Sequence, residues 1–270
     1  MKFIKNLLNV FFASVVYLVK LFPNKVKVLI LDKFQFQDKL DFFKSDIYIN
    51  ISSPISLSRL KSVSKEPKTV EWIENYFKKD DVFFDVGANI GAYSLISASI
   101  GKNIKVYSFE PVPGTFNDLC LNVKRNSLQK FIFPVNVCLS NFDKVSLFAL
   151  SSLESGAGLH KGLYNLEDDL DINHFNYYTS TYKLDTLVEK FQFPIPNHIK
   201  IDVDGHELGV LEGAINTLSN ENVNSIQIEV DENIQSGKEI VEFIFKLGFK
   251  ISEKNLHPDT LNTFDYIFIK

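Results

Sequence analysis

The stretch from Val82 to Gly91 reads VFFDVGANIG and decides the fold of this chain. Val82 to Val86 is a short run of β-branched and aromatic residues, which predicts a buried strand, and the residues from Ala92 onward show helical spacing. Asp85 therefore lies at the carboxyl end of a parallel strand. In open α/β sheets ligands bind in that crevice, where glycine lets the backbone approach them closely. The candidate cofactor contacts are Asp85 at the strand end and Gly87, Ala88, Asn89 and Gly91 around the helix start.

Three cofactor-binding loops compete for this stretch. A P-loop needs Gly-Lys-Ser or Gly-Lys-Thr, and no lysine lies between Phe84 and Ile100, which excludes it. A dinucleotide fingerprint begun at Gly87 needs glycines where the chain has Asn89 and Ala92, and an acidic strand end repels pyrophosphate. S-adenosylmethionine carries a positive sulfonium and no phosphate. The loop therefore favours S-adenosylmethionine as the cofactor.

A second acid follows one β-α-β step later. Lys105 to Phe109 predicts the next strand, and Glu110 ends it directly before Pro111, which cannot continue a strand ladder. A carboxylate at this position accepts two charge-assisted hydrogen bonds from a ribose diol. An NAD enzyme has an acid there too, so only the combination of Glu110 with the Asp85 loop discriminates.

More polar residues surround a later strand end. His198 to Val203 predicts a buried strand, after which Gly205 opens a helix. Methyl transfer to a hydroxyl requires that donor and acceptor are aligned and that the acceptor's proton is removed. We expect Asp202 to orient the methionine end of the cofactor or the acceptor, and His206 or Glu207 to take the proton. Helix capping for Asp202, solvent exposure for His206 and the helix dipole for Glu207 are the competing explanations.

Four blocks of sequence together resemble the FkbM family of S-adenosylmethionine-dependent methyltransferases, over roughly Trp72 to the C-terminus. They read DVGANIGAYSL, FEPVPGTFNDLCLNV, LDTL and IKIDVDGHELGVLEGA. The resemblance implies a class I, Rossmann-like α/β fold, with a seven-stranded, mostly parallel sheet and one reversed edge strand. It also implies O-methylation of a hydroxyl on a glycan or other small-molecule natural product. Asp204 stands where the family more often has Glu, and Asn136 near a predicted strand end is a candidate for the adenine contact or a purely structural residue.

The N-terminal part of the chain carries no such motif. We expect residues 1–65 to form a helical extension or cap and residues 66–270 to form the methyltransferase domain. Leu7 to Val19 is apolar, but at about 13 residues it is shorter than the ~20 that span a bilayer, and no cleavage site follows it. Residues 3–22 therefore either pack on the domain or on a second copy of the chain, as in a homodimer, or lie in the plane of a membrane.

Two further stretches are predicted to flank the acceptor. Lys25 to Lys65 contains a helix candidate near Val26 to Phe34 and a strand candidate near Ile47 to Ile51, and it is a candidate lid. Ser151 to Tyr178 is a long segment between strands, and loops of such length are uncommon unless they serve a function. We expect a substrate-facing insertion there.

Composition narrows the partners. A net charge of −4 and a pI of about 5.8 argue against a nucleic-acid partner, which clustered Lys and Arg would bind.

Cys120 and Cys138 lack CxxC spacing, so we expect two reduced, buried thiols. We expect a cytoplasmic protein, which is peripheral on the inner membrane face if the N-terminal helix binds lipid. No matched ligand set is visible, so no metal is expected; an ion bridging Asp202 and a second acid is the alternative. A non-catalytic scaffold that docks a partner or a membrane is the competing function.

Overall fold

The computed structural model describes residues 14–33, 36–158, 162–164, 174–257 and 262–270. The chain divides into two compact units, Met1–Gln37 and Asp38–Lys270. In the first unit, residues 14–20 are helical and α2 spans Asn24–Lys33, which confirms the helix predicted near Val26 to Phe34. Among the described residues, none of the helices combines the length and the apolar character that a bilayer crossing requires.

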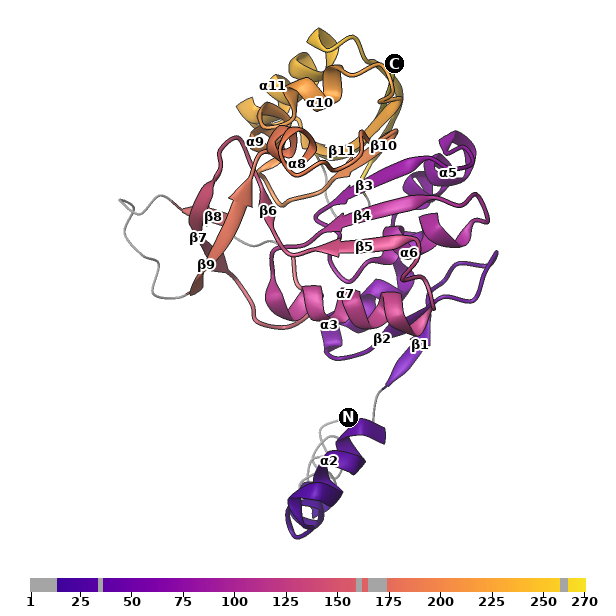
Figure 1. The fold of residues 1–270 in the computed structure, drawn as a ribbon, viewed down its shortest axis with the longest axis vertical. Helices are drawn as coiled ribbons and strands as arrows, with labels where there is room; N and C mark the ends of the chain where they lie inside the picture. Colours follow the sequence, from indigo (N-terminus) through magenta and orange to yellow (C-terminus); the bar gives the residue numbers. More distant parts are fainter. Residues whose placement is uncertain (1–13, 34–35, 159–161, 165–173, 258–261) are drawn as a thin grey trace. The chain divides into compact units, whose positions relative to one another are not determined.

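The second unit is built on a seven-stranded sheet with the order β12-β13-β11-β10-β3-β4-β5 (Figure 1). The strands are β3 (Val82–Val86), β4 (Lys105–Phe109), β5 (Ile132–Val135), β10 (His198–Ile201), β11 (Ser225–Asp231), β12 (Lys250–Leu256) and β13 (Thr263–Ile269). The sheet is mostly parallel, as predicted, and the reversed strand is β13, which pairs antiparallel with both β11 and β12. The reversed strand thus lies one place in from the edge.

Helices cover both faces of this sheet. The helices are α5 (Pro67–Tyr76), α6 (Ala92–Ser99), α7 (Pro113–Arg125), α8 (Leu184–Glu189), α9 (Glu207–Glu212), α10 (Ile215–Ser219) and α11 (Gln235–Lys246). Side chains alternate along a strand, so Phe83 packs with Trp72, Leu95 and Leu119 of α5, α6 and α7. Phe84 belongs to the opposite core, with α8 to α11. Burial on both faces explains the continuous apolar run of β3.

A smaller sheet with the order β6-β9-β7-β8 extends beyond β5 (Figure 1). Its strands are β6 (Cys138–Leu139), β7 (Lys144–Leu150), β8 (Gly162–Tyr164) and β9 (Phe175–Tyr182). The segment predicted as one strand from Phe131 to Leu139 is thus two short strands in two sheets. The Ser151 to Tyr178 excursion ends in strand rather than in loop, because β9 pairs antiparallel with β7 from Phe175 onward. Residues 159–161 and 165–173 of the excursion lie outside the described residues.

The segment before α5 belongs to the main unit. It contains β1 (Gln37–Lys39), β2 (Tyr48–Asn50), α3 (Pro54–Ser58), the 3₁₀ turn η1 (Arg59–Lys61) and α4 (Ser62–Lys65). Leu40, Phe42, Ile47 and Ile49 are buried in the core on the α5–α7 face. The division expected between residues 65 and 66 therefore differs from the observed one, because these apolar side chains are part of the domain core.

Both cysteines are free thiols, in agreement with the sequence. Cys120 on α7 and Cys138 on β6 are each half-buried rather than fully buried.

Candidate functional site

A cavity of about 610 Å³ opens at the carboxyl ends of the central parallel strands. Gly87 follows β3, Glu110 follows β4, Asp202 follows β10 and Glu229 lies near the end of β11, and all four line it. This volume is within the range of small-molecule sites. The ends of these four strands therefore meet at one edge of the sheet, beside the cavity.

The loop after β3 packs closely against protein atoms at both of its glycines. Gly87 has φ of +80°, and a Cβ there would lie 1.8 Å from the carbonyl oxygen of Asp202 on the neighbouring strand. Gly91 has φ of +89°, and its Cβ would lie 2.4 Å from Cδ1 of Leu119. Asn89 also has positive φ, at +51°, and lines the cavity with Gly87. Gly91 and the buried Ala88 do not line it; they shape the loop.

Glu110 is the acid best placed to bind a cofactor. One carboxylate oxygen accepts a hydrogen bond from the backbone N–H of Asn89 at 3.0 Å, and the other accepts from Val112 at 2.8 Å. Glu110 is 5% exposed, and burial raises the pKa of its carboxyl to about 7. Each oxygen has a second lone pair, so the carboxylate still has capacity for a diol.

Asp85 does not reach the cavity, contrary to its predicted role. It is 1% exposed, and it accepts a hydrogen bond from Oγ of Ser94 on α6 at 2.5 Å. Its register partner on β10 is Lys200, so both side chains point to the α5–α7 face. Burial raises the pKa of Asp85, and Lys200 opposes that shift. Asp85 therefore binds Ser94 of α6 and interacts electrostatically with the buried Lys200. It influences the cavity only indirectly, through these two residues.

Asp202 and Lys200 form the charged centre of the site. Nζ of Lys200 lies 2.6 Å from Oδ2 of Asp202 and 5.0 Å from the ring centroid of Tyr93. Burial alone would raise the pKa of Asp202, but the Lys200 ammonium outweighs it and the pKa is lowered. Asp202 is thus a fixed carboxylate in the cavity. Sequence reasoning missed Lys200, although a lysine inside an apolar strand is a signal, because a buried charge needs partners.

Of the two residues at the turn after β10 that were predicted to take a proton, only one lines the cavity. His206 lines the cavity, together with Asp204. Glu207 does not; it is 8% exposed, and its Oε1 accepts hydrogen bonds from the backbone N–H groups of Gly205 at 2.9 Å and Val203 at 3.3 Å. Glu207 therefore holds the turn in shape, and His206 is the member of the pair that faces the cavity.

The wall beyond Glu110 comes from the start of the smaller sheet. Val137, Cys138 and Leu139 line the cavity there. Asn136, the predicted adenine contact, is exposed and outside this lining. Its amide donates to the carbonyl oxygens of Glu110 at 2.8 Å and Pro111 at 3.1 Å. The structural explanation of Asn136 is therefore the one that its contacts support.

Residues that sequence reasoning missed complete the opposite wall. Arg59, Lys65 and Glu66 line the cavity from the segment before α5. Arg59 donates to the carbonyl oxygen of Gly156 from Nε at 3.1 Å and from Nη2 at 2.8 Å. Both segments that were predicted to flank the acceptor thus meet at the cavity. Their approach rests on contacts between distant parts of the chain, which local sequence patterns do not reveal.

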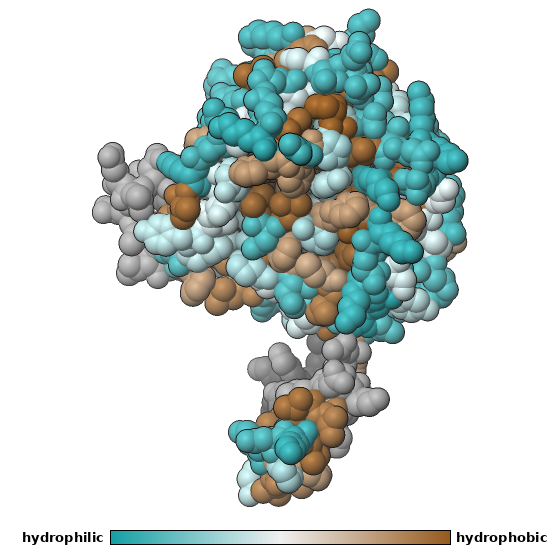
Figure 2. All heavy atoms as spheres, in the orientation of Figure 1, coloured by the Kyte–Doolittle hydropathy of each residue, from teal (hydrophilic) through white to brown (hydrophobic). Residues whose placement is uncertain are grey.

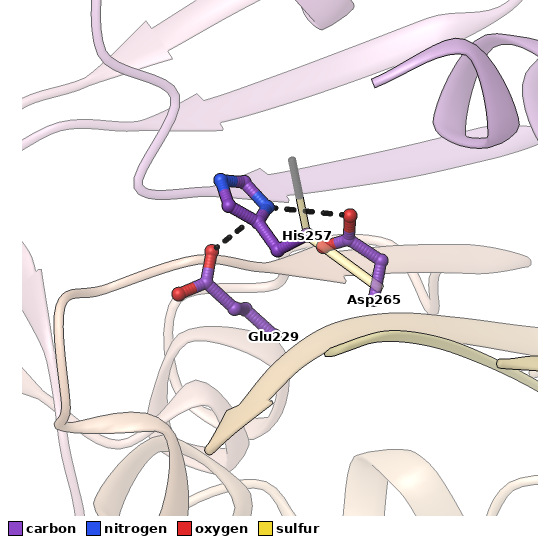
Figure 3. A group of neighbouring side chains, drawn as sticks. All are labelled: Glu229, His257 and Asp265. Atoms are coloured by element: carbon purple, nitrogen blue, oxygen red, sulfur yellow. Dashed lines mark hydrogen bonds and ion pairs between the residues drawn. The ribbon is translucent and has the colours of Figure 1, made fainter. Parts of the chain in front are cut away.

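Three more ionisable side chains gather on the β11 side of the cavity. Nδ1 of His257 lies 3.6 Å from Oε2 of Glu229 and 3.4 Å from Oδ2 of Asp265 (Figure 3). Glu229 and Asp265 are register partners on adjacent strands, and His257 follows β12. Burial raises the pKa of Glu229 to about 7. Local sequence patterns do not link Glu229 to His257, because Glu229 lies on β11 and His257 follows β12, and the two meet only in the folded sheet.

The sheet has the order of a class I, Rossmann-like methyltransferase fold, and a cavity opens at its carboxyl edge. A glycine loop at the end of β3 and an acid at the end of β4 fit a nucleoside with a ribose diol. Gly87, Asn89 and Glu110 are the residues that would hold it.

Comparison with known proteins gives the family. The model of the methyltransferase FkbM domain matches residues 85–251, and the chain belongs to this family. It is 29% identical over 211 residues to the hexuronic acid methyltransferase AglP from Haloferax volcanii, covering 77% of this chain and 81% of AglP. The crystal structure of a methyltransferase FkbM from Methylobacillus flagellatus aligns with a TM-score of 0.52 at 15% identity, over 80% of this chain and 52% of that one. The protein is an S-adenosylmethionine-dependent methyltransferase.

Proposed function

We propose that this enzyme methylates a hydroxyl group of a glycan that contains a hexuronic acid. The observation that carries the proposal is that one cavity joins the nucleoside-binding residues Gly87 and Glu110 to a second set of charged side chains. Arg59 and Lys65 in that set match the carboxylate of a hexuronic acid. The relative AglP is named for hexuronic acid methylation, which supports the same acceptor class.

The reaction is an in-line displacement at a methyl carbon. S-adenosylmethionine supplies an electrophilic methyl group on a sulfonium. The acceptor oxygen forms the new O–C bond as the S–C bond breaks, the bonding pair stays on sulfur, and the hydroxyl proton leaves to a base. Alignment in a cavity of this kind supplies several kcal/mol of the barrier reduction.

His206 is the proposed proton acceptor. It faces the cavity from the turn after β10, and a ring nitrogen of a neutral imidazole can accept the proton of a hydroxyl group. Asp202 is proposed to orient the donor's methionine end or the acceptor, because its carboxylate is held ionised by Lys200. Glu207 has no such part, since it holds the turn that presents His206.

Mass spectrometry of oligosaccharides with a terminal hexuronic acid tests the acceptor. The enzyme with S-adenosylmethionine should add 14 Da, and the product should resist mild alkali, as an ether does and a methyl ester does not. An alkali-labile product would contradict hydroxyl methylation, and no gain on any uronic acid glycan would contradict the acceptor class.

Two substitutions test the base. His206→Gln should lower turnover by about 10²–10⁴-fold while leaving cofactor affinity unchanged. Glu212→Gln is the matched control, because Glu212 lies on the same helix and its carboxylate binds only the exposed amide of Asn141 among the contacts described. Equal turnover in both variants would contradict the role of His206.

The N-terminal unit is proposed to bind a membrane surface peripherally. Its described part exposes Tyr17, Leu18, Leu21 and Phe22, and Figure 2 shows these helices with a largely apolar surface. Residues 3–13 of the predicted 3–22 anchor lie outside the described residues. Flotation with anionic phosphatidylglycerol vesicles should carry the parent protein and leave a Leu18→Glu, Leu21→Glu variant behind. Flotation of neither protein would contradict the contact.

The intact cavity and family membership favour an enzyme over a scaffold.

A further inference from the structure

Glu229, His257 and Asp265 bring three potential metal-ligating atoms together beside the cavity. One ligand atom from each lies within 4.8 Å of the others. The two carboxylates project from directly opposite positions of β11 and β13, and the His257 ring stands over both of them (Figure 3). The three residues come from three different elements, so the fold and not a local motif creates the cluster.

Hydrogen bonding alone does not explain this arrangement well. Nδ1 makes a long hydrogen-bond contact of 3.4 Å with Oδ2 of Asp265, and its separation of 3.6 Å from Oε2 of Glu229 exceeds the ~2.7–3.2 Å of an N–H···O hydrogen bond. Nδ1 carries at most one proton, which cannot serve both carboxylates at these distances. Two ligands that each lie ~2.0–2.2 Å from one tetrahedral ion stand ~3.3–3.6 Å apart. The two distances to His257 therefore match neighbouring ligands of a single metal ion.

The local charge points the same way. Like charges directly opposite each other on paired strands destabilise a sheet, and Glu229 and Asp265 are such a pair. The carboxylates of Glu66 and Asp202 interact with the same group, and the His257 imidazole and the ammonium of Lys200 oppose their negative charge. Two carboxylates and a neutral imidazole around a divalent ion form a neutral unit, which removes the excess negative charge.

The cluster also has a supporting shell and an open side. Asp265 is 6% exposed, and Nε2 of Gln227 lies 3.4 Å from its second oxygen. Gln227 is itself 1% exposed. Among the described residues, its buried Oε1 has no hydrogen-bond partner, so one oxygen acceptor next to Asp265 is unsatisfied. Glu229 and His257 line the cavity. Three protein ligands with an open position toward the substrate are the pattern of a catalytic metal site.

We propose that Glu229, His257 and Asp265 bind one divalent transition-metal ion, whose open coordination position takes the acceptor's hydroxyl oxygen. The second half of this proposal rests on the proposed function. A metal-bound hydroxyl loses its proton more readily, which assists the base. The proposal replaces the expectation of a metal-free site. A histidine ligand favours Zn²⁺ over Mg²⁺ or Ca²⁺, which prefer oxygen, and the two carboxylates also suit Mn²⁺.

Metal titration without an acceptor tests the site. Chelator-stripped protein should bind one equivalent of Mn²⁺ by electron paramagnetic resonance, and Co²⁺ should give visible absorption. His257→Gln and Asp265→Asn should each weaken binding at least tenfold. Glu239→Gln on the exposed face of α11 is the matched control and should bind like the parent. S-adenosylmethionine binding reports whether the variants are folded. No stoichiometric binding by the parent, or equal binding by all variants, overturns the proposal.

Activity then tests the role of the ion. Methylation should fall at least tenfold after chelation and return when Mn²⁺ is added. A protein that binds the ion but methylates no uronic acid glycan refutes the proposed function and leaves the metal site standing. Full activity after chelation refutes the role of the metal. If the parent protein binds no metal and His257→Gln still loses activity, the metal proposal is also overturned. The imidazole of His257 would then itself be the proton acceptor.

Discussion

Replacing Gly87 by alanine should weaken cofactor binding, because two independent costs meet at this position. Gly87 has φ of +80°, and a left-handed conformation costs an L-residue about 1–2 kcal/mol. The new Cβ would also lie 1.8 Å from the carbonyl oxygen of Asp202, where real contacts exceed 3.0 Å. The chain at β3 and β10 must therefore separate by more than about 1 Å, a displacement that costs on the order of 10²-fold in a positioned site.

The separation also threatens the sheet at its ligand edge. The backbone N–H of Asp202 donates to the carbonyl oxygen of Val86 at 3.0 Å, directly beside the clash. Loss of that bond adds about 1 kcal/mol to the conformational strain. We expect Gly87→Ala to lower the free energy of unfolding by about 2–3 kcal/mol and to weaken S-adenosylmethionine binding at least tenfold.

Gly101→Ala is the matched control. Gly101 has φ of +76°, and nothing lies within 4 Å of its Cβ position, so it carries the strain without the clash. It should lose about 1–2 kcal/mol of stability and keep the parent's cofactor affinity. Calorimetric titration and denaturant unfolding of both variants measure the two effects. The reasoning is refuted if Gly87→Ala binds the cofactor within twofold of the parent, or if Gly101→Ala loses as much affinity.

Three further outcomes follow from buried charges. Burial raises the pKa of Glu110 to about 7, so S-adenosylmethionine affinity should fall as the pH drops below 7, by up to tenfold per pH unit, and Glu110→Gln should flatten this profile in calorimetric titrations. Lys200→Met leaves the partly exposed carboxylate of Asp202 unpaired and should destabilise the protein by about 1–3 kcal/mol, whereas an unchanged urea midpoint would contradict the pairing. Burial lowers the pKa of His198, an effect partly offset by its hydrogen bond to Asp81, so the folded state resists a proton that the unfolded chain accepts. Stability should therefore decline as the pH falls below about 6.5, and a His198→Gln variant that declines equally would disprove this source.

Much of the sheet could be predicted from sequence, because its strands are buried on both faces. The runs at Val82–Val86 and Lys105–Phe109 are continuous, short and bounded by glycine or proline, and both are strands with the predicted limits. β9 was missed because Phe175–Tyr182 is rich in polar and tyrosine residues and only half-buried, which resembles a loop. Its pairing with β7 is a contact between distant segments.

The direction of side chains at the strand ends was harder to predict. Strand periodicity places Asp85 on the same face as Phe83, but it does not say whether that face meets a helix or a ligand. The structure puts Ser94 of α6 against Asp85, so the acid of the most informative motif is structural in its direct contacts. Glu110 follows its strand rather than lying within it, and for that reason its side chain reaches the cavity.

A crystal structure of the protein with bound S-adenosylhomocysteine tests the central claim most directly. Both ribose hydroxyl groups should lie within hydrogen-bonding distance of the Glu110 carboxylate, with the homocysteine end beside Gly87 and near the side-chain carboxylate of Asp202. A nucleoside bound away from the ends of β3 and β4 would contradict the account.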